Sequence, residues 1–124
     1  MSNEMKDWIR ENQYEAVLDY ERICKETALY PNADKDLTYP IMGLAGETGE
    51  LCNKYKKFLR GDFTEDELKE FAENLADEVG DILWYLTRIS NTLGFSLADI
   101  MRINSTKLID RKERGVIKGS GDKR

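Results

Sequence analysis

Three stretches of the chain carry polar and charged side chains at the same spacing, i, i+3, i+7 and i+10. At 100° per residue of an α-helix, each set covers one narrow helix face. In all three stretches the apolar stripe is centred on the same rotational side of the set, so the polar faces are able to converge on one pocket. The sets are Glu47, Glu50, Lys54 and Lys57; then Glu78, Asp81, Tyr85 and Arg88; then Asn104, Lys107, Arg111 and Arg114.

The acidic members of these sets suggest a metal site. If Glu47, Glu50, Glu78 and Asp81 face one another, four carboxylates crowd the edge of an apolar core. Two like charges 4 Å apart repel by about 4 kcal/mol at an effective dielectric constant near 20. Protonation or bound cations must relieve this repulsion, and carboxylate oxygens prefer Mg²⁺, with Mn²⁺ as a substitute.

The third set suggests what the metal would act on. Asn104, Lys107 and Arg111 offer charge-assisted donors to phosphate oxygens. Metal carboxylates beside a cationic face indicate a phosphorylated substrate that is attacked by metal-activated water. Three glycines, at positions 43, 46 and 49, each cost a helix interior about 1 kcal/mol relative to alanine. We therefore expect a need for close approach there, with Gly43 leaving room for metal or ligand.

Four helical stretches are expected to position these faces, over about residues 4–29, 39–60, 64–93 and 96–115. Gly61 is placed to end the second stretch in the left-handed conformation. Thr64 with Glu67, and Ser96 with Asp99, are placed to cap the third and fourth stretches at their N-terminal ends. No repeat, linker or alternating strand pattern is found. The prediction is a single all-α domain of the four-helix-bundle type over residues 1–124, ending in a basic, glycine-rich tail at 115–124.

Composition excludes several kinds of protein. The 124 residues include no histidine, which rules out Ser-His-Asp and Cys-His catalysis and His-ligated zinc. Cys24 and Cys52 are too few for a cysteine-rich zinc site and fit a reducing compartment. The net charge of −5 argues against binding polymeric nucleic acid. The longest apolar run, Ile82 to Leu86, is far short of the ~20 residues that span a membrane, and no signal-peptide core is found, so we expect a cytoplasmic protein.

Two segments resemble a known family. Residues 43–51 followed by residues 77–86 closely resemble the MazG-like nucleotide pyrophosphohydrolases, which belong to the all-α NTP pyrophosphatase superfamily. The family pattern is E-x-x-E, a variable gap, then E-x-x-D, and here 27 residues separate Glu50 from Glu78. Downstream, residues 104–111 resemble the family segment N-x-x-K-L-x-x-R. The resemblance covers about residues 39–124, and the N-terminal helix matches only in type.

The resemblance implies Mg²⁺-dependent cleavage of a nucleoside or deoxynucleoside triphosphate between its α and β phosphates. The products would be a monophosphate and pyrophosphate, in a house-cleaning role on the nucleotide pool. It implies four metal ligands, of which Glu47, or else Glu50, also orients or deprotonates the attacking water. The ligands are Glu47, Glu50, Glu78 and Asp81. The substrate contacts are Tyr85 toward the nucleotide, Asn104, Lys107 and Arg111 toward phosphate and sugar, and Lys54 or Lys57 toward the β,γ-phosphates.

Two alternatives remain open. The chain could be a relative that acts on phosphoribosyl-ATP, or a non-catalytic helical interaction module that has kept the fold. Retention of all four acids argues against the module. Taken one at a time, such acids are usually solvated surface residues, and Glu50 with Lys54 is also an ordinary i,i+4 pair.

We further expect a homodimer or homotetramer, because a short bundle with charged faces beside its core needs a partner to cover apolar surface.

Overall fold

The computed structural model describes residues 3–121, with side chains described for residues 3–4 and 14–121. These residues form five helices and no strand, which confirms the predicted all-α fold. The helices are α1 (Asn3–Glu26), α2 (Thr38–Arg60), α3 (Glu65–Lys69), α4 (Phe71–Thr92) and α5 (Leu97–Glu113). None of them is long and apolar enough to cross a membrane.

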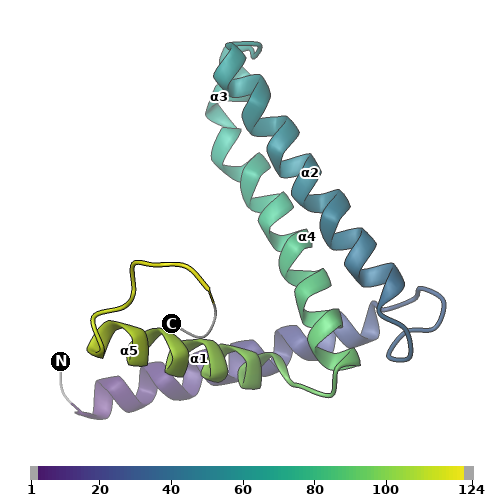
Figure 1. Ribbon diagram of the computed structural model, residues 1–124. Coiled ribbons are helices and arrows are strands. Elements are labelled where there is room, and N and C mark those ends of the chain that lie inside the picture. The colour runs from purple at the N-terminus through teal and green to yellow at the C-terminus, as the bar shows by residue number, and fades with distance from the viewer. Residues whose placement is uncertain (1–2, 122–124) are drawn as a thin grey trace.

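The helices form two pairs that meet at one end of α4. α2 and α4 pack as an antiparallel hairpin with the short α3 at its far end, and α1 and α5 lie side by side across the base of that hairpin (Figure 1). Among the described residues, α2 approaches neither α1 nor α5, whereas α4 contacts all the other helices. The hairpin, called here the α2–α4 arm, therefore stands away from the rest of the chain.

Contacts along the α2–α4 arm fix the register of its two helices. The rings of Phe58 and Phe71 stack near the tip with centroids 4.4 Å apart, and Tyr85 lies against Gly43 near the base. Between these two points the chain is regular helix on both sides. The antiparallel register consequently places the middle of α2, at Glu47, opposite the middle of α4, at Glu78 and Asp81.

The predicted helix over residues 64–93 is wrong in one respect, because the structure divides it into α3 and α4. Glu70 leaves helical geometry (φ −91°, ψ 4°), and its N–H bonds back to the carbonyls of Asp66 and Leu68. The residue has no glycine or proline beside it, so local sequence gave no signal for the break. The turn allows the chain to cap the arm and bring Phe71 against Phe58.

The predicted helix ends are confirmed. Thr64 accepts a hydrogen bond from the Glu67 N–H while the Glu67 carboxylate accepts one from the Thr64 N–H, which completes a capping box. Ser96 and Asp99 form the same reciprocal pair at the start of α5. Gly61 ends α2 in the left-handed conformation with φ 74°, where a side chain would be strained.

One chain buries little apolar surface. Among the described residues, the buried apolar side chains are few: Cys24 and Pro40 are fully buried, and Tyr30 and Leu97 are nearly so. Val79 and Leu86 of α4, and Leu93 directly after its last residue, repeat at seven-residue intervals and are about half exposed (54%, 43% and 55%). These three residues, called here the outer α4 stripe, form an apolar face that α2 does not cover.

Candidate metal and nucleotide site

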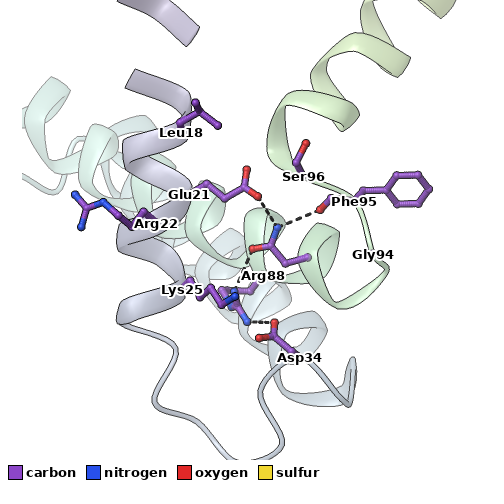
Figure 2. A pocket seen from close by; sticks show the side chains of 10 residues that line it. Leu18, Glu21, Arg22, Lys25, Asp34, Arg88, Gly94, Phe95 and Ser96 are labelled. Atoms are coloured by element: carbon purple, nitrogen blue, oxygen red, sulfur yellow. Dashed lines mark hydrogen bonds and ion pairs between the residues drawn. The ribbon is translucent and has the colours of Figure 1, made fainter. Parts of the chain in front are cut away.

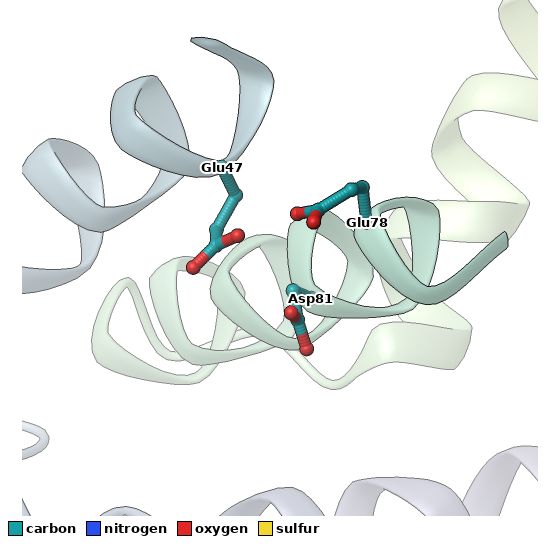
Figure 3. Close-up of side chains that lie close together, drawn as sticks. All are labelled: Glu47, Glu78 and Asp81. Carbon is teal, nitrogen blue, oxygen red and sulfur yellow. The ribbon is translucent and has the colours of Figure 1, made fainter. Parts of the chain in front are cut away.

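Three carboxylates meet in the middle of the α2–α4 arm. Glu47 projects from α2, and Glu78 and Asp81 project one helical turn apart from α4 (Figure 3). One oxygen from each carboxylate lies within 4.8 Å of the others. Hard oxygen donors gathered at this separation are suited to Mg²⁺ or Mn²⁺. The group is called here the carboxylate cluster.

Lys54 holds Glu78 in its ionised form. The Lys54 Nζ lies 2.6 Å from Glu78 Oε1, and it also donates a hydrogen bond to the Asn74 carbonyl at 3.2 Å. This ammonium lowers the pKa of Glu78, which is itself buried, and Glu78 in turn raises the pKa of Lys54. Lys54 is thus paired, and its charge balances one acid of the carboxylate cluster.

The pKa of Glu47 is shifted in the opposite direction to that of Glu78. A side-chain hydrogen bond with Glu78 raises the pKa of Glu47, and partial burial and the charge of Asp81 add to the effect. A raised pKa in a carboxyl beside other acids reflects like-charge repulsion. The same repulsion would be relieved by a cation, so the residues present fit the divalent metal that the sequence predicts.

Glu50 and Lys57 lie outside this group. Glu50 is exposed one turn after Glu47 on α2, and its charge acts on both Glu47 and Lys54. Lys57 lines a separate cleft of about 260 Å³ near the tip of the arm, beside the rings of Phe58 and Phe71. The assignment of Glu50 as a ligand and of Lys57 as a phosphate contact stays a prediction.

Tyr85 lies where Gly43 leaves space. A Cβ built on Gly43 would stand 2.1 Å from Tyr85 Cε1, so the ring occupies the volume that a side chain there would fill. The expectation that Gly43 leaves room for metal or ligand is therefore wrong for this chain, because the room holds an aromatic ring. A Cβ on Gly46 or Gly49 would meet nothing within 4 Å. Close approach explains the first glycine alone.

Tyr85 also forms one wall of a cleft of about 500 Å³ at the base of the arm. Tyr39 lies beside it, with ring centroids 6.5 Å apart. The charge of Glu47 acts on the Tyr85 hydroxyl and, after burial, helps to raise its pKa, which places the cleft next to the carboxylate cluster. The cleft is lined by Pro31, Asn32, Asp36, Thr38, Tyr39, Met42, Gly43 and Tyr85.

The cationic face of α5 does not reach the carboxylate cluster within one chain. Asn104 and Lys107 are exposed, and Arg111 is buried. α5 contacts α1 and α4, and in the described part of the chain it makes no approach to α2. The expected convergence of three polar faces is thus observed for α2 and α4 only.

Sequence reasoning missed the loop between α1 and α2. Asp36 accepts hydrogen bonds from both the backbone N–H and the hydroxyl of Thr38, which fixes the start of α2 at the edge of the cleft. The Asp-x-Thr spacing before the helix was the available signal. Tyr39 gave no such signal, because its role depends on the ring of Tyr85 across the arm.

The chain is similar to known proteins over most of its length. Residues 38–116 match the MazG nucleotide pyrophosphohydrolase domain, from the start of α2 to just beyond α5, so α1 lies outside the match. The chain is also similar to the Gene 37 protein of Mycobacterium phage L5, with 42% identity over 113 residues, which cover 85% of this chain and 96% of that protein. No solved structure matches.

Fold, carboxylate cluster and match together define an all-α nucleotide pyrophosphohydrolase domain. The chain belongs to the MazG nucleotide pyrophosphohydrolase family, and the resemblance found in the two motifs is confirmed. The family uses a divalent metal ion on a nucleoside triphosphate, and Glu47, Glu78 and Asp81 are the residues whose geometry fits such an ion.

Proposed function

We propose that this protein is a Mg²⁺-dependent nucleoside triphosphate pyrophosphohydrolase that cleaves between the α and β phosphates. Its products are a nucleoside monophosphate and pyrophosphate, and its role is house-cleaning of the cytoplasmic nucleotide pool. The observation that carries the proposal is the carboxylate cluster, in which Glu47, Glu78 and Asp81 place oxygens within 4.8 Å of one another. Glu50, one turn from Glu47, is proposed as a fourth ligand.

The carboxylate cluster has two roles in the proposed reaction, which are metal binding and acceptance of a proton from water. A divalent cation bound by the cluster supplies positive charge to the phosphate oxygens on which negative charge develops. Glu47 is the proposed base, because it is the acid that α2 sets opposite Glu78 and Asp81, and a carboxylate positioned beside the attacking water can take its proton. The water oxygen forms a bond to phosphorus, the bridging P–O bond breaks, and the proton passes to Glu47. Pyrophosphate is the leaving group when the α phosphorus is attacked.

The clefts beside the cluster suggest how the substrate lies. The cleft walled by Tyr39 and Tyr85 adjoins the cluster and has aromatic faces on which a base can stack, so we place the nucleoside there. The β,γ-phosphates then extend along α2 toward Lys54 and Lys57, two and three turns beyond the cluster residue Glu47 in the direction of the arm's tip. Both clefts and the cluster lie on the same arm.

A second copy of the chain is part of this proposal. A compact monomer of 14.4 kDa would expose about 6,800 Å² by the usual scaling of surface with mass, whereas this chain exposes 9515 Å². The excess is comparable to what one subunit buries in an obligate homodimer. Because Asn104, Lys107 and Arg111 do not reach the cluster of their own chain, we propose that a homodimer, or a homotetramer built from it, supplies them across the subunit boundary.

A substrate panel tests the proposal. The full chain would be assayed with Mg²⁺ against the eight common NTPs and dNTPs and against phosphoribosyl-ATP, with pyrophosphate and orthophosphate measured separately. Pyrophosphate in equal amount to the monophosphate is expected from at least one triphosphate. Orthophosphate as the sole product would refute α–β cleavage. Exclusive turnover of phosphoribosyl-ATP would favour that alternative, and no turnover together with no Mg²⁺-dependent stabilisation would favour the interaction module.

A further inference from the structure

Arg88 is the largest fully buried side chain among the described residues. It belongs to the polar series of α4 that begins at Glu78, yet it lies ten residues further on, at the junction of the arm with α1 and α5. Its guanidinium is 0% exposed. Burying a charge is costly unless the charge is paired and hydrogen-bonded, so the groups that satisfy Arg88 indicate what it is for.

Two of those groups lie in the loop between α1 and α2. Arg88 Nη2 forms an ion pair with Asp34 (Figure 2). Arg88 Nε donates a hydrogen bond to the Tyr30 hydroxyl at 3.3 Å. The loop is in an unusual conformation, because Asn32 and Asp34 have positive φ values of 57° and 64°. Asparagine and aspartate tolerate this left-handed region better than other side chains. The ion pair with Arg88 fixes the side chain of Asp34 in this conformation.

The same loop connects Arg88 to the cleft proposed for the nucleoside. The ring of Tyr30 stacks on that of Tyr39, with centroids 4.6 Å apart and planes 4° from parallel. Tyr39 in turn lies beside Tyr85, and both rings line the cleft. Loop residues on either side of Asp34, at positions 32 and 36, line it as well. Arg88 itself is not among the lining residues, so it acts on the cleft through its partners.

We propose that Arg88 is a positioning residue for nucleotide binding, which holds the α1–α2 loop and the stacked Tyr30 and Tyr39 in the place that forms the cleft wall. The inference rests on the proposed function, since it assumes that the nucleoside occupies this cleft. It assigns a role to a residue outside the carboxylate cluster, and it predicts that loss of its loop contacts weakens substrate binding rather than the chemical step.

The guanidinium also has a side that faces away from the cleft. Arg88 Nη1 donates to Asn91 Oδ1 at 3.1 Å, and Asn91 Nδ2 donates to Glu21 of α1 at 3.0 Å. The other Glu21 oxygen accepts from the Leu97 N–H at the start of α5. These bonds join helices α1, α4 and α5 and involve no residue of the cleft. They provide a matched control, because Asn91 contacts the same guanidinium in a purely structural role.

The test compares Asp34→Gly and Tyr30→Phe with Asn91→Ala in the full-length protein. Glycine keeps the positive φ at position 34 and removes only the carboxylate, and phenylalanine keeps the stacking ring and removes only the hydroxyl. With the best substrate of the panel, both variants should raise KM by about tenfold and change kcat by less than about twofold. Asn91→Ala should lower Tm and leave KM near the wild-type value.

Near-ultraviolet circular dichroism provides a readout that needs no turnover. Tyr30, Tyr39, Trp84 and Tyr85 form one cluster, since Trp84 lies 6.0 Å from Tyr30 and 5.0 Å from Tyr85. Asp34→Gly and Tyr30→Phe should alter the near-ultraviolet signal of this cluster, and Asn91→Ala should not. Tyr14→Phe is the reference for the loss of a tyrosine hydroxyl, and its effect is subtracted from that of Tyr30→Phe.

Two results would overturn the positioning role: unchanged KM and spectrum in Asp34→Gly and Tyr30→Phe, or an equal rise in KM in Asn91→Ala. Arg88→Lys keeps a positive charge for Asp34 but cannot also donate a hydrogen bond to Tyr30. Its KM should lie between that of the wild type and that of Arg88→Met. A wild-type protein that hydrolyses no nucleotide would instead refute the proposed function, and the spectra would still decide whether Arg88 orders the aromatic wall.

Discussion

The ring of Tyr85 packs directly on the backbone of Gly43, so closely that a Cβ on Gly43 would stand 2.1 Å from Tyr85 Cε1. A contact this short cannot be tolerated, and the neighbouring group is a rigid ring rather than the end of a flexible side chain. The ring also walls the cleft beside the carboxylate cluster. The glycine is therefore required by the aromatic residue across the arm.

Gly43→Ala is expected to displace the Tyr85 ring and reduce kcat/KM by about tenfold or more, since small displacements of positioning groups cost large factors in rate. Steady-state kinetics on the best triphosphate, with circular dichroism to verify the helix content, measures this. Gly46→Ala is the control. Nothing lies within 4 Å of its added Cβ, so it should raise the free energy of unfolding by about 1 kcal/mol and leave activity unchanged. Equal loss of activity in both variants would contradict the assignment to Tyr85.

The carboxylate cluster predicts a linked loss of metal binding and turnover. In the wild type, Mg²⁺ at 100 times its Kd should add about 2.7 kcal/mol to the free energy of unfolding, and EDTA should remove it. Glu78→Gln and Asp81→Asn should abolish this stabilisation and lower kcat/KM by about 100-fold or more. Asp77→Asn changes a neighbouring exposed acid outside the cluster and should do neither.

Glu50→Gln decides the fourth ligand. If Glu50 completes the metal shell as proposed, the substitution abolishes turnover while the helix content stays the same. Activity within a few-fold of the wild type would restrict the ligand set to the three acids whose oxygens already lie within 4.8 Å. Titration of Mg²⁺ against thermal unfolding measures the binding loss separately from the rate.

The cap of α5 predicts a pH dependence of stability. Hydrogen bonds from the backbone and side chain of Ser96 hold the pKa of Asp99 below its ordinary value. A carboxyl with a lowered pKa in the folded state contributes stability above its unfolded pKa and loses it as pH falls through the folded pKa. Asp99→Asn should therefore lower Tm at pH 7, and the difference from the wild type should shrink as pH falls below the ordinary pKa of an aspartate, about 3.9. A constant difference across this range would show that the carboxylate charge is not involved.

The outer α4 stripe predicts the subunit contact. Leu86→Glu places a charge in the middle of that apolar face and should convert the homo-oligomer to a monomer of 14.4 kDa in sedimentation equilibrium. Activity should fall with it, because the proposed α5 contacts come from the second copy. Leu29→Glu, at a highly exposed position in the α1–α2 loop, is the control and should preserve the oligomer. A wild-type protein that sediments as a monomer would contradict the proposal.

Local chemistry made much of this fold predictable. The capping boxes at Thr64 and Ser96 and the left-handed end at Gly61 depend on residues close in sequence, and each is observed. The break at Glu70 was missed, because it is set by ring packing at the tip of the arm and not by the residue itself. Local patterns predict where helices begin and end more reliably than where tertiary contacts interrupt them.

The parts of the site that depend on local spacing were predictable, and the parts that depend on helix packing were not. Helical spacing placed Glu78 and Asp81 on one face, and the structure sets Glu47 opposite them. The convergence of α5 on the same point was not observed, since the angle between helix pairs depends on packing that spacing does not encode. Helical spacing placed Arg88 in the polar series of α4, but its complete burial and its pairing with Asp34 are properties of the junction.

The isolation of the α2–α4 arm has a consequence for how the protein opens. The three acids of the carboxylate cluster lie on two helices that, within one chain, α1 and α5 cover only at the base. Local opening of such a region costs less than global unfolding, so its amides should exchange with solvent first. A cation shared between α2 and α4 would hold the two helices of this hairpin together. Catalytic readiness and the protection of the arm's amides from exchange would then rise and fall together, set by the free magnesium concentration of the cell.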